Sequence, residues 1–390
     1  AITLSAAGDI TVLGVVSGSQ FSIQSKSRSD AGIAGDGSPV TITSNAGSIS
    51  VNGDINSSSI GSVSSGNAGS VALNAPGSIT IDNIDASAGD LATTAASGSG
   101  GAVTLTTSAD ITAGDISSAS SGGSGGAIDL DSGSNINAGS ITLGSIAGLT
   151  SDPFTADAPT TITIAGLAPN AAYINIGTQT RPGNLLLPNV IDTDGGNVTL
   201  LVGNAYTFAT DLTTDLGIFN LDGLQALTLN SSIDTNGGDV NVQTGSGALI
   251  INGPISAGDA LLDSATIELA ADSDLILNSN VTAASIVLSA GNVITQSAET
   301  SINATNLGVA AVVAPTLNLG TGDVVTLAAQ ISGAGNPFSF TDSNGLIVGQ
   351  VGSLAGISTN NGDVTLDVAG DLTVDDPIST DSTIVLQATE

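Results

Sequence analysis

The chain has 390 residues, of which 35 are acidic and three are basic, so its formal net charge is −32. This balance excludes nucleic acid and anionic membrane surfaces as partners, because phosphate binding requires clustered Lys and Arg. The absence of Cys and His excludes disulfides, thiolate metal sites and the usual catalytic triads. Acid–base chemistry would fall to carboxylates, Tyr173, Tyr206 or the three basic residues, and we expect no enzyme activity and no catalytic residue.

The apolar residues are mostly small and aliphatic. They make up 41% of the chain, whereas aromatic residues make up 2% and Trp and Met are absent. Such residues suit narrow stacked strands better than an irregular globular core. High charge with few aromatics is also typical of disorder, but the apolar residues here are periodic. No apolar run reaches roughly 18 residues, so we expect no membrane insertion. A chain without Met is expected to be a processed product or a part of a longer protein.

Residues 1–150 are rich in Ser, Gly and Ala and contain short strand patterns behind a glycine. Apolar and polar residues alternate in each pattern, as in a strand with one buried face. Examples begin at Gly47, Gly69, Gly101, Gly126 and Gly139. The connections between them are long and rich in glycine, as at residues 117–126. Their regular placement predicts loops along one edge of a stack of β-solenoid coils.

Residues 151–190 interrupt this pattern. Five of the 11 prolines lie there, together with Phe154, Tyr173 and Arg181. Proline cannot donate a hydrogen bond inside a sheet, so we expect an irregular insertion or a transition between two sets of coils. A small binding subsite is the alternative.

Residues 191–390 contain a motif that is repeated. Ile191–Leu200 recurs at residues 233–242 and 357–366, each time as an apolar residue, a polar turn with glycine and an alternating strand. Residues 370–378 also align without a gap on residues 247–255, which adds a second strand to the unit. We expect a coil corner followed by strands with inward-facing side chains, namely Val198, Leu200, Val240, Val242, Val364 and Leu366. Phe338 and Phe340 are expected on one face of a strand, in the core.

The fold predicted from this spacing is an all-β parallel solenoid. Equivalent strands lie tens of residues apart with other elements between them, which favours a solenoid over an antiparallel sandwich or barrel. With roughly 20 to 30 residues per coil, the chain would form roughly 13–19 coils. One coil alone cannot bury its apolar side chains. We therefore expect the partners to be flanking coils of the same protein or other copies of it.

We expect no cofactor. The alternative is calcium, which several pairs of acidic residues suggest. Asp192, Asp194 and Asn197 carry oxygen ligands, but the distal glutamate of an EF-hand loop and the nonapeptide of calcium-binding β-rolls are missing. Asn236 and Asn360 replace the central acid in the other copies, which favours a turn role. Three further pairs have turn or strand explanations: Asp129 with Asp131, Asp272 with Asp274, and Asp375 with Asp376.

The sequence at residues 101–116 and 361–374 resembles the large filamentous-haemagglutinin-like exoproteins of bacteria, among them cyanobacterial surface proteins. The resemblance covers most of the chain outside about residues 151–190. It implies a right-handed parallel β-helix, two-partner secretion through a dedicated outer-membrane pore, and adhesive or structural work at the cell surface. The secretion domain of that family is not recognisable in this sequence.

The resulting expectation is a non-enzymatic, extracellular structural and adhesive rod of a large secreted bacterial surface protein. Its partners would include host-cell, matrix or glycan surfaces. One alternative is the subunit of an extracellular fibre or surface layer that stacks end to end. A second is a β-helical carbohydrate-binding or carbohydrate-active protein, which the absence of His and the scarcity of Lys and Arg disfavour.

Overall fold

The computed structural model describes residues 1–13, 21–30, 33–62, 64–90, 98–143, 153–168, 173–258, 264–317 and 324–389. All regular secondary-structure elements assigned in these ranges are β-strands. They contain no helix with the length and apolar content that a membrane span requires. The chain divides into two compact units, residues 1–203 (unit 1) and residues 204–390 (unit 2).

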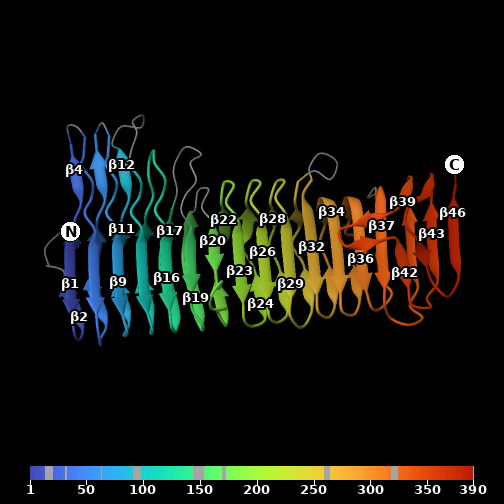
Figure 1. The fold of residues 1–390 in the computed structure, drawn as a ribbon, viewed down its shortest axis with the longest axis horizontal. Helices are drawn as coiled ribbons and strands as arrows, with labels where there is room; N and C mark the ends of the chain where they lie inside the picture. Colours follow the sequence, from blue (N-terminus) through green and yellow to red (C-terminus); the bar gives the residue numbers. More distant parts are fainter. Residues whose placement is uncertain are drawn as a thin grey trace. The chain divides into compact units, whose positions relative to one another are not determined.

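One face of unit 1 is a row of eight parallel strands, each from a successive coil (Figure 1). They are β1 (Ile2–Ala6), β5 (Val40–Ser44), β9 (Val71–Ala75), β13 (Val103–Thr107), β16 (Ile128–Ser132), β18 (Phe154–Asp157), β20 (Ile174–Ile176) and β23 (Val198–Val202). The strands pair in register, so that Val40, Val71 and Val103 lie side by side. Each apolar position therefore stacks on the same position of the next coil.

Two further rows complete the coils of unit 1. The second row contains β2 (Ile10–Leu13), β6 (Ile49–Asn52), β10 (Ile79–Ile81), β14 (Ile111–Ala113), β17 (Asn135–Thr142), β19 (Thr161–Ala168) and β21 (Asn184–Leu186). The third contains β3 (Phe21–Gln24), β7 (Asp54–Asn56), β11 (Ile84–Asp85) and β15 (Ile116–Ser117), and it continues along the last residues of β17 and β19. Strand β22 (Val190–Asp192) precedes β23.

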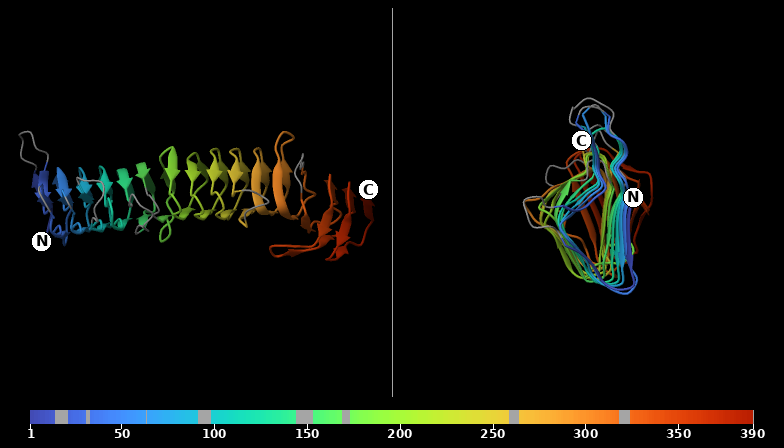
Figure 2. Two further views of the ribbon diagram at one scale, coloured as in Figure 1. Left: turned by 90° about the horizontal axis from the view of Figure 1, so that it is seen from above. Right: turned by 90° about the vertical axis from the view of Figure 1, so that its left-hand side faces the viewer.

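The first coils of unit 1 carry a two-layered extension, which we call the fin. Its outgoing layer includes β4 (Ser27–Ser29), β8 (Ser59–Gly61) and β12 (Ala88–Asp90). The chain returns through residues 33–38, 64–69 and 98–101. The right-hand view of Figure 2 shows the blue and cyan ribbons of these coils extended at the top.

Serine and glycine join the two layers of the fin. Ser57 and Ser118 are fully buried, and their hydroxyls donate to the carbonyl oxygens of Gly69 (2.6 Å) and Gly126 (2.5 Å) in the returning layer. The amides of the same glycines donate back to the carbonyls of Ser57 (2.8 Å) and Ser118 (2.9 Å). A Cβ on either glycine would meet the backbone of the preceding coil. Residues 117–126 are therefore part of an ordered, closely packed extension.

Strands continue through the described parts of residues 151–190. Phe154 is fully buried between the equivalent positions Ile128 and Ile174. Tyr173 is 45% exposed at the start of β20. Pro169 lies outside the described residues. The prolines thus flank strands that keep the register of the coils before them.

Unit 2 repeats the three-row arrangement. Its first row contains β26 (Phe219–Gly223), β29 (Val240–Thr244), β32 (Thr266–Ala271), β34 (Val281–Ala290), β36 (Ile302–Ala311) and β37 (Thr326–Ile331). The second contains β24 (Tyr206–Phe208), β27 (Leu227–Leu229), β30 (Leu249–Ile251), β33 (Leu275–Leu277) and β35 (Ile294–Gln296). The third contains β25 (Asp211–Thr213), β28 (Ile233–Asp234) and β31 (Ile255–Ser256), and it joins the first residues of β34 and β36.

The last coils of unit 2 change this arrangement at β37. The first residues of β37 pair with β39 (Leu346–Val348) and its last residues pair with β42 (Ile357–Thr359). In the next coil, β44 (Leu372–Val374) pairs with β39 and β45 (Ile378–Ser379) pairs with β42. A separate sheet contains β38 (Phe338–Asp342), β43 (Val364–Val368) and β46 (Ile384–Ala388). Between β39 and β42 the chain forms an antiparallel hairpin of β40 (Gln350–Val351) and β41 (Leu354–Ala355).

The core consists of the inward aliphatic side chains. All six predicted inward residues of the repeated motif are at most 1% exposed. Phe338 and Phe340 are also buried, with stacked rings whose centroids are 6.3 Å apart. These observations confirm the prediction of an all-β parallel β-helix. In the described residues, unit 1 has eight coils, and unit 2 has six first-row strands followed by two further coils. The total number of coils falls within the predicted range of roughly 13–19.

Candidate functional site

Four corners share one hydrogen bond, in which a threonine hydroxyl donates to the carbonyl oxygen three residues later. The pairs are Thr193 with Gly196, Thr214 with Gly217, Thr235 with Gly238, and Thr359 with Gly362. The backbone between them enters the left-handed region, with φ of 47° at Asp194 and 46° at Asn236. Glycine follows at both places, with φ of 102° at Gly195 and 111° at Gly237. The repeated sequence motif therefore forms a closed coil corner.

The sequence motif does not identify one of these corners, at residues 212–219, because Leu216 stands where Gly195 and Gly237 stand in the other copies. Leu216 has a φ of 78° and is 71% exposed. A residue with a Cβ is strained at such a φ, by about 1–3 kcal/mol. The exposed leucine side chain gains no burial that would offset this strain.

Leu216→Gly is expected to stabilise unit 2. Relief of the strain outweighs the extra backbone entropy that glycine loses on folding, which leaves a net gain of about 0.5–1 kcal/mol. Thermal unfolding followed by far-ultraviolet circular dichroism measures the change. Leu216→Ala is the matched control, because it removes the exposed side chain and keeps the Cβ at positive φ. Equal gains from both variants would show that side-chain exposure, and not backbone strain, is relieved.

The sequence-predicted calcium candidates lie at the corner that begins after β22. Asp192 and Asp194 are exposed and Asn197 is half-buried. Asp192 Oδ1 accepts a hydrogen bond from the amide of Asp194 at 3.2 Å, and Asp234 Oδ1 accepts the equivalent bond from Asn236 at 3.1 Å. The first acid of the motif thus caps the turn in both copies, whichever residue follows. Among the described residues, no group of three His, Cys, Asp or Glu is arranged to hold a metal ion.

A shallow cavity of about 350 Å³ lies beside this corner. Its lining combines Leu167, Ala168 and Val190 with the carboxylates of Asp192 and Asp194. Val190 is 60% exposed. The side chains of this lining offer only the two carboxylates as oxygen ligands, whereas Ca²⁺ takes six to eight oxygen ligands. The turn role therefore explains these side chains better than calcium does.

We expect calcium to leave the Tm unchanged to within about 1 °C, because only a site with many more ligands would bind the folded protein tightly. The measurement compares thermal unfolding in calcium with unfolding in chelator. Asp192→Asn is the control, since Asn can still accept the amide of Asp194. A calcium-dependent rise of several degrees that this variant abolishes would establish calcium binding at the corner.

Many aspartates link one coil to the next. The Asp9 and Asp115 carboxylates accept the amides of Ser48 (2.7 Å) and Ser140 (2.8 Å). Asp211 Oδ1 accepts both the amide (2.9 Å) and the hydroxyl (2.8 Å) of Ser232. These bonds favour the ionised form and lower the pKa of Asp211 below its ordinary value. A substantial part of the acidity of the chain is therefore structural.

Two of the other acidic pairs lie in connections between strands. The amides of Asp375 and Asp376 donate to the carbonyl of Val348 (2.9 and 3.0 Å), which places them in a turn. Asp274 Oδ1 accepts the side-chain amide of Asn292 at 2.6 Å, another bond between coils. Burial raises the pKa of Tyr206, which keeps its phenol neutral.

Asp129 and Asp131 lie on one side of β16, as their spacing predicts, and β16 pairs with β18. Asp131 lies beside Asp157 in the strand register. Asp157 is 3% exposed, and its Oδ1 accepts the amides of Gln179 (2.8 Å) and Thr180 (3.1 Å). Burial raises the pKa of the Asp129 carboxyl above its ordinary value of 3.8, and repulsion from Asp131 and Asp157 raises it further. Folding thus makes the ionised form of Asp129 less favourable than it is in the unfolded chain.

Asp129→Asn is expected to raise the Tm at neutral pH by about 1 °C, because it removes the unfavourable ionised carboxyl. The advantage should disappear below the ordinary pKa of 3.8, where the carboxyl is protonated in both the folded and the unfolded state. Thermal unfolding at the two pH values measures this. Asp272→Asn, at an exposed position, serves as the control. An equal gain at both pH values would mean that the effect is not electrostatic.

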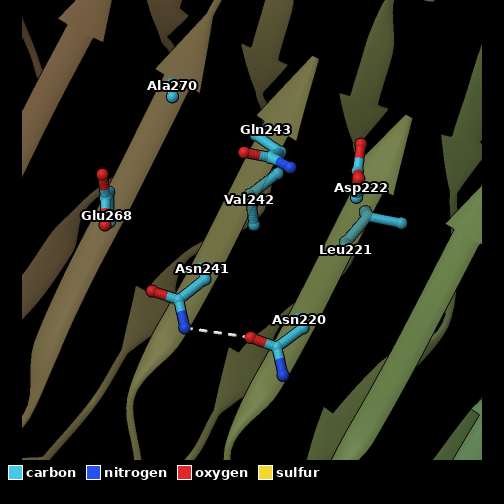
Figure 3. A pocket seen from close by; sticks show the side chains of 8 residues that line it. All are labelled: Asn220, Leu221, Asp222, Asn241, Val242, Gln243, Glu268 and Ala270. Atoms are coloured by element: carbon cyan, nitrogen blue, oxygen red, sulfur yellow. Dashed lines mark hydrogen bonds between the residues drawn. The ribbon is translucent and has the colours of Figure 1, made fainter. Parts of the chain in front are cut away.

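Sequence reasoning missed a polar groove on the outer face of β26, β29 and β32. The groove has a volume of about 200 Å³ and is lined by Asn220, Leu221, Asp222, Asn241, Val242, Gln243, Glu268 and Ala270 (Figure 3). Asn241 Nδ2 donates to Asn220 Oδ1 at 2.9 Å across the two strands. The sequence signal for this groove is a polar residue at every second position of these strands. In the sequence alone, that pattern predicts only that this face is exposed to solvent.

The fold and these sites define a parallel β-solenoid repeat protein whose conspicuous polar residues mostly close corners and link coils. No family model, no curated protein and no solved structure matches the chain.

Proposed function

We propose that this chain is a non-enzymatic structural and adhesive repeat protein of a bacterial cell surface, of the filamentous-haemagglutinin-like kind. The observation that supports this most is the use of its carboxylates in bonds between coils, as at Asp9, Asp115 and Asp211. Each such bond joins residues of adjacent coils. The chemistry of the side chains thus serves the continuity of the stack, which is the requirement of an extended surface protein.

Beads coated with the purified protein test the adhesive role. We expect them to adhere to host-cell, matrix or glycan surfaces without releasing products from glycan substrates, since the chain has no His and three basic residues. Beads coated with a globular protein of similar net charge are the control. Adhesion no better than the control would contradict the adhesive role, and product release would favour the carbohydrate-active alternative.

End-to-end stacking of copies is a second candidate, since the apolar edge at β46 can be covered either by further coils of a longer chain or by another copy. Ile384 and Leu386 are 43% and 44% exposed, whereas their partners one coil earlier, Val364 and Leu366, are fully buried. Another strand with apolar residues at these positions would bury them and pair the open edge. Sedimentation velocity of the wild type and of an Ile384→Lys variant tests this. A concentration-independent monomer in both proteins would exclude stacking.

A further inference from the structure

We propose that the polar groove over β26, β29 and β32 binds an extended cationic glycan, a polymer of amino sugars. This inference rests on the proposed adhesive role and names the class of its ligand.

The groove presents polar side chains in two columns that cross the strands. Strand register places Asn220, Asn241 and Glu268 in one column and Asp222, Gln243 and Ala270 in the other. Neighbouring parallel strands are about 4.8 Å apart, so each column offers a side chain at that interval. A linear polymer lying along the first column would meet a polar side chain at every strand, whereas the second column ends at Ala270. Figure 3 shows these side chains projecting from one face of three adjacent strands.

The chemical groups in the groove match those of an amino sugar. Side-chain amides such as those of Asn241 and Gln243 both donate and accept hydrogen bonds, as sugar hydroxyls do. Asp222 and Glu268 lie on the two strands that flank the strand of Gln243, and carboxylates accept strong, charge-assisted bonds from ammonium groups. Gln243 and Glu268 are exposed to solvent, so a ligand reaches them without displacing the chain.

The negative charge of the protein favours a cationic glycan over anionic and neutral ones. With 35 acidic and three basic residues, the protein repels uronate and sulfated polymers and attracts cationic ones. The groove has no aromatic side chain on which a neutral sugar ring could stack. Neutral glycans therefore depend on hydrogen bonds alone, whereas an amino-sugar polymer adds an ion pair at each carboxylate.

The same sheet face is covered further along by the chain itself. The column of Glu268 continues through Val287, Gly308 and Ala328 on the following strands. There the hairpin β40–β41 packs on the sheet, with Val351 and Leu354 over Gly308. Outward residues are small or apolar where the hairpin covers them and polar where the face is open. Along the column of Glu268, the side chains are therefore apolar or absent where the hairpin packs and polar where the face is open.

Isothermal titration calorimetry of the full chain tests the proposal with three soluble oligomers: β-1,4-linked glucosamine, its N-acetylated neutral counterpart and oligogalacturonate. At mildly acidic pH the amines are protonated and most carboxylates remain ionised. We expect the glucosamine oligomer to bind best and the anionic oligomer not to bind. Asp222→Asn with Glu268→Gln keeps the shape of the groove and should weaken glucosamine binding about tenfold.

The matched control is Asp375→Asn with Glu299→Gln, which removes one aspartate and one glutamate charge at exposed positions of unit 2 outside the groove. Unchanged binding by this control supports the groove. Equal losses in both double variants, or equal binding of oligolysine, would reduce the effect to general charge attraction and overturn the proposal. Absence of glucosamine binding would overturn it too. Coated beads that still adhere in that case would show that the adhesive role stands and that the groove is not its site.

Discussion

Gly100→Val is expected to destabilise unit 1 by about 3 kcal/mol or more, at the upper end of the costs of overpacking. Gly100 lies in the returning layer of the fin, and its Cβ would clash with the carbonyl oxygen of Ser118 and with the backbone amide of Gly126. These two backbone groups are hydrogen-bonded to each other across the layers of the fin, at 2.9 Å, so neither can move aside alone. Urea denaturation measures the free energy of unfolding, and hydrogen exchange locates the loss.

Gly89→Ala is the control for this prediction. Gly89 also lies in the fin, in β12, but no atom lies within 4 Å of the position its Cβ would occupy. The substitution should be neutral or slightly stabilising, because alanine has less backbone entropy to lose. Exchange in the Gly100→Val variant should accelerate first at residues 98–101 and 118–126. A variant as stable as wild type would mean that the two layers of the fin are not in contact in solution.

The fin is the part of the fold that could not be predicted from the sequence. Inward positions such as Val240 and Val242 could be predicted because the signal, alternation along one strand, is local. The Ser–Gly contacts between the two layers of the fin leave no such signal, since linkers and backbone-to-backbone packing favour the same small residues. Ser57 and Gly69 acquire their meaning only once the layers lie against each other.

The candidate sites divide in the same way. The turn role of Asp192 could be predicted because it depends on an amide two residues away. The groove could not, because its columns join residues 21 and then 27 positions apart, as between Asn220, Asn241 and Glu268. Variable coil lengths conceal which outward residues become neighbours. The corner at Leu216 was concealed for a different reason, since there the local rule for glycine is broken.

Phe219→Ala is expected to destabilise unit 2 by about 3–5 kcal/mol. Phe219 is fully buried, and its ring centroid lies 5.5 Å from that of Phe208 in a tilted pair. The substitution removes that aromatic contact and leaves a cavity beside Val240, the partner of Phe219 in the next coil. Phe219→Leu is the control, because it retains most of the volume and should cost about 1.5 kcal/mol or less.

The location of this loss tests how the coils share stability. If each coil depends mainly on its neighbours, exchange should accelerate at residues 206–244 and remain slow in the last coils, at residues 338–374. The structure supports this expectation, because the inward aliphatic residues are distributed evenly over the coils that it describes. Uniform acceleration across unit 2 would instead show that the unit unfolds as a single cooperative body. A loss below about 1 kcal/mol would mean that neighbouring side chains refill the space of the ring.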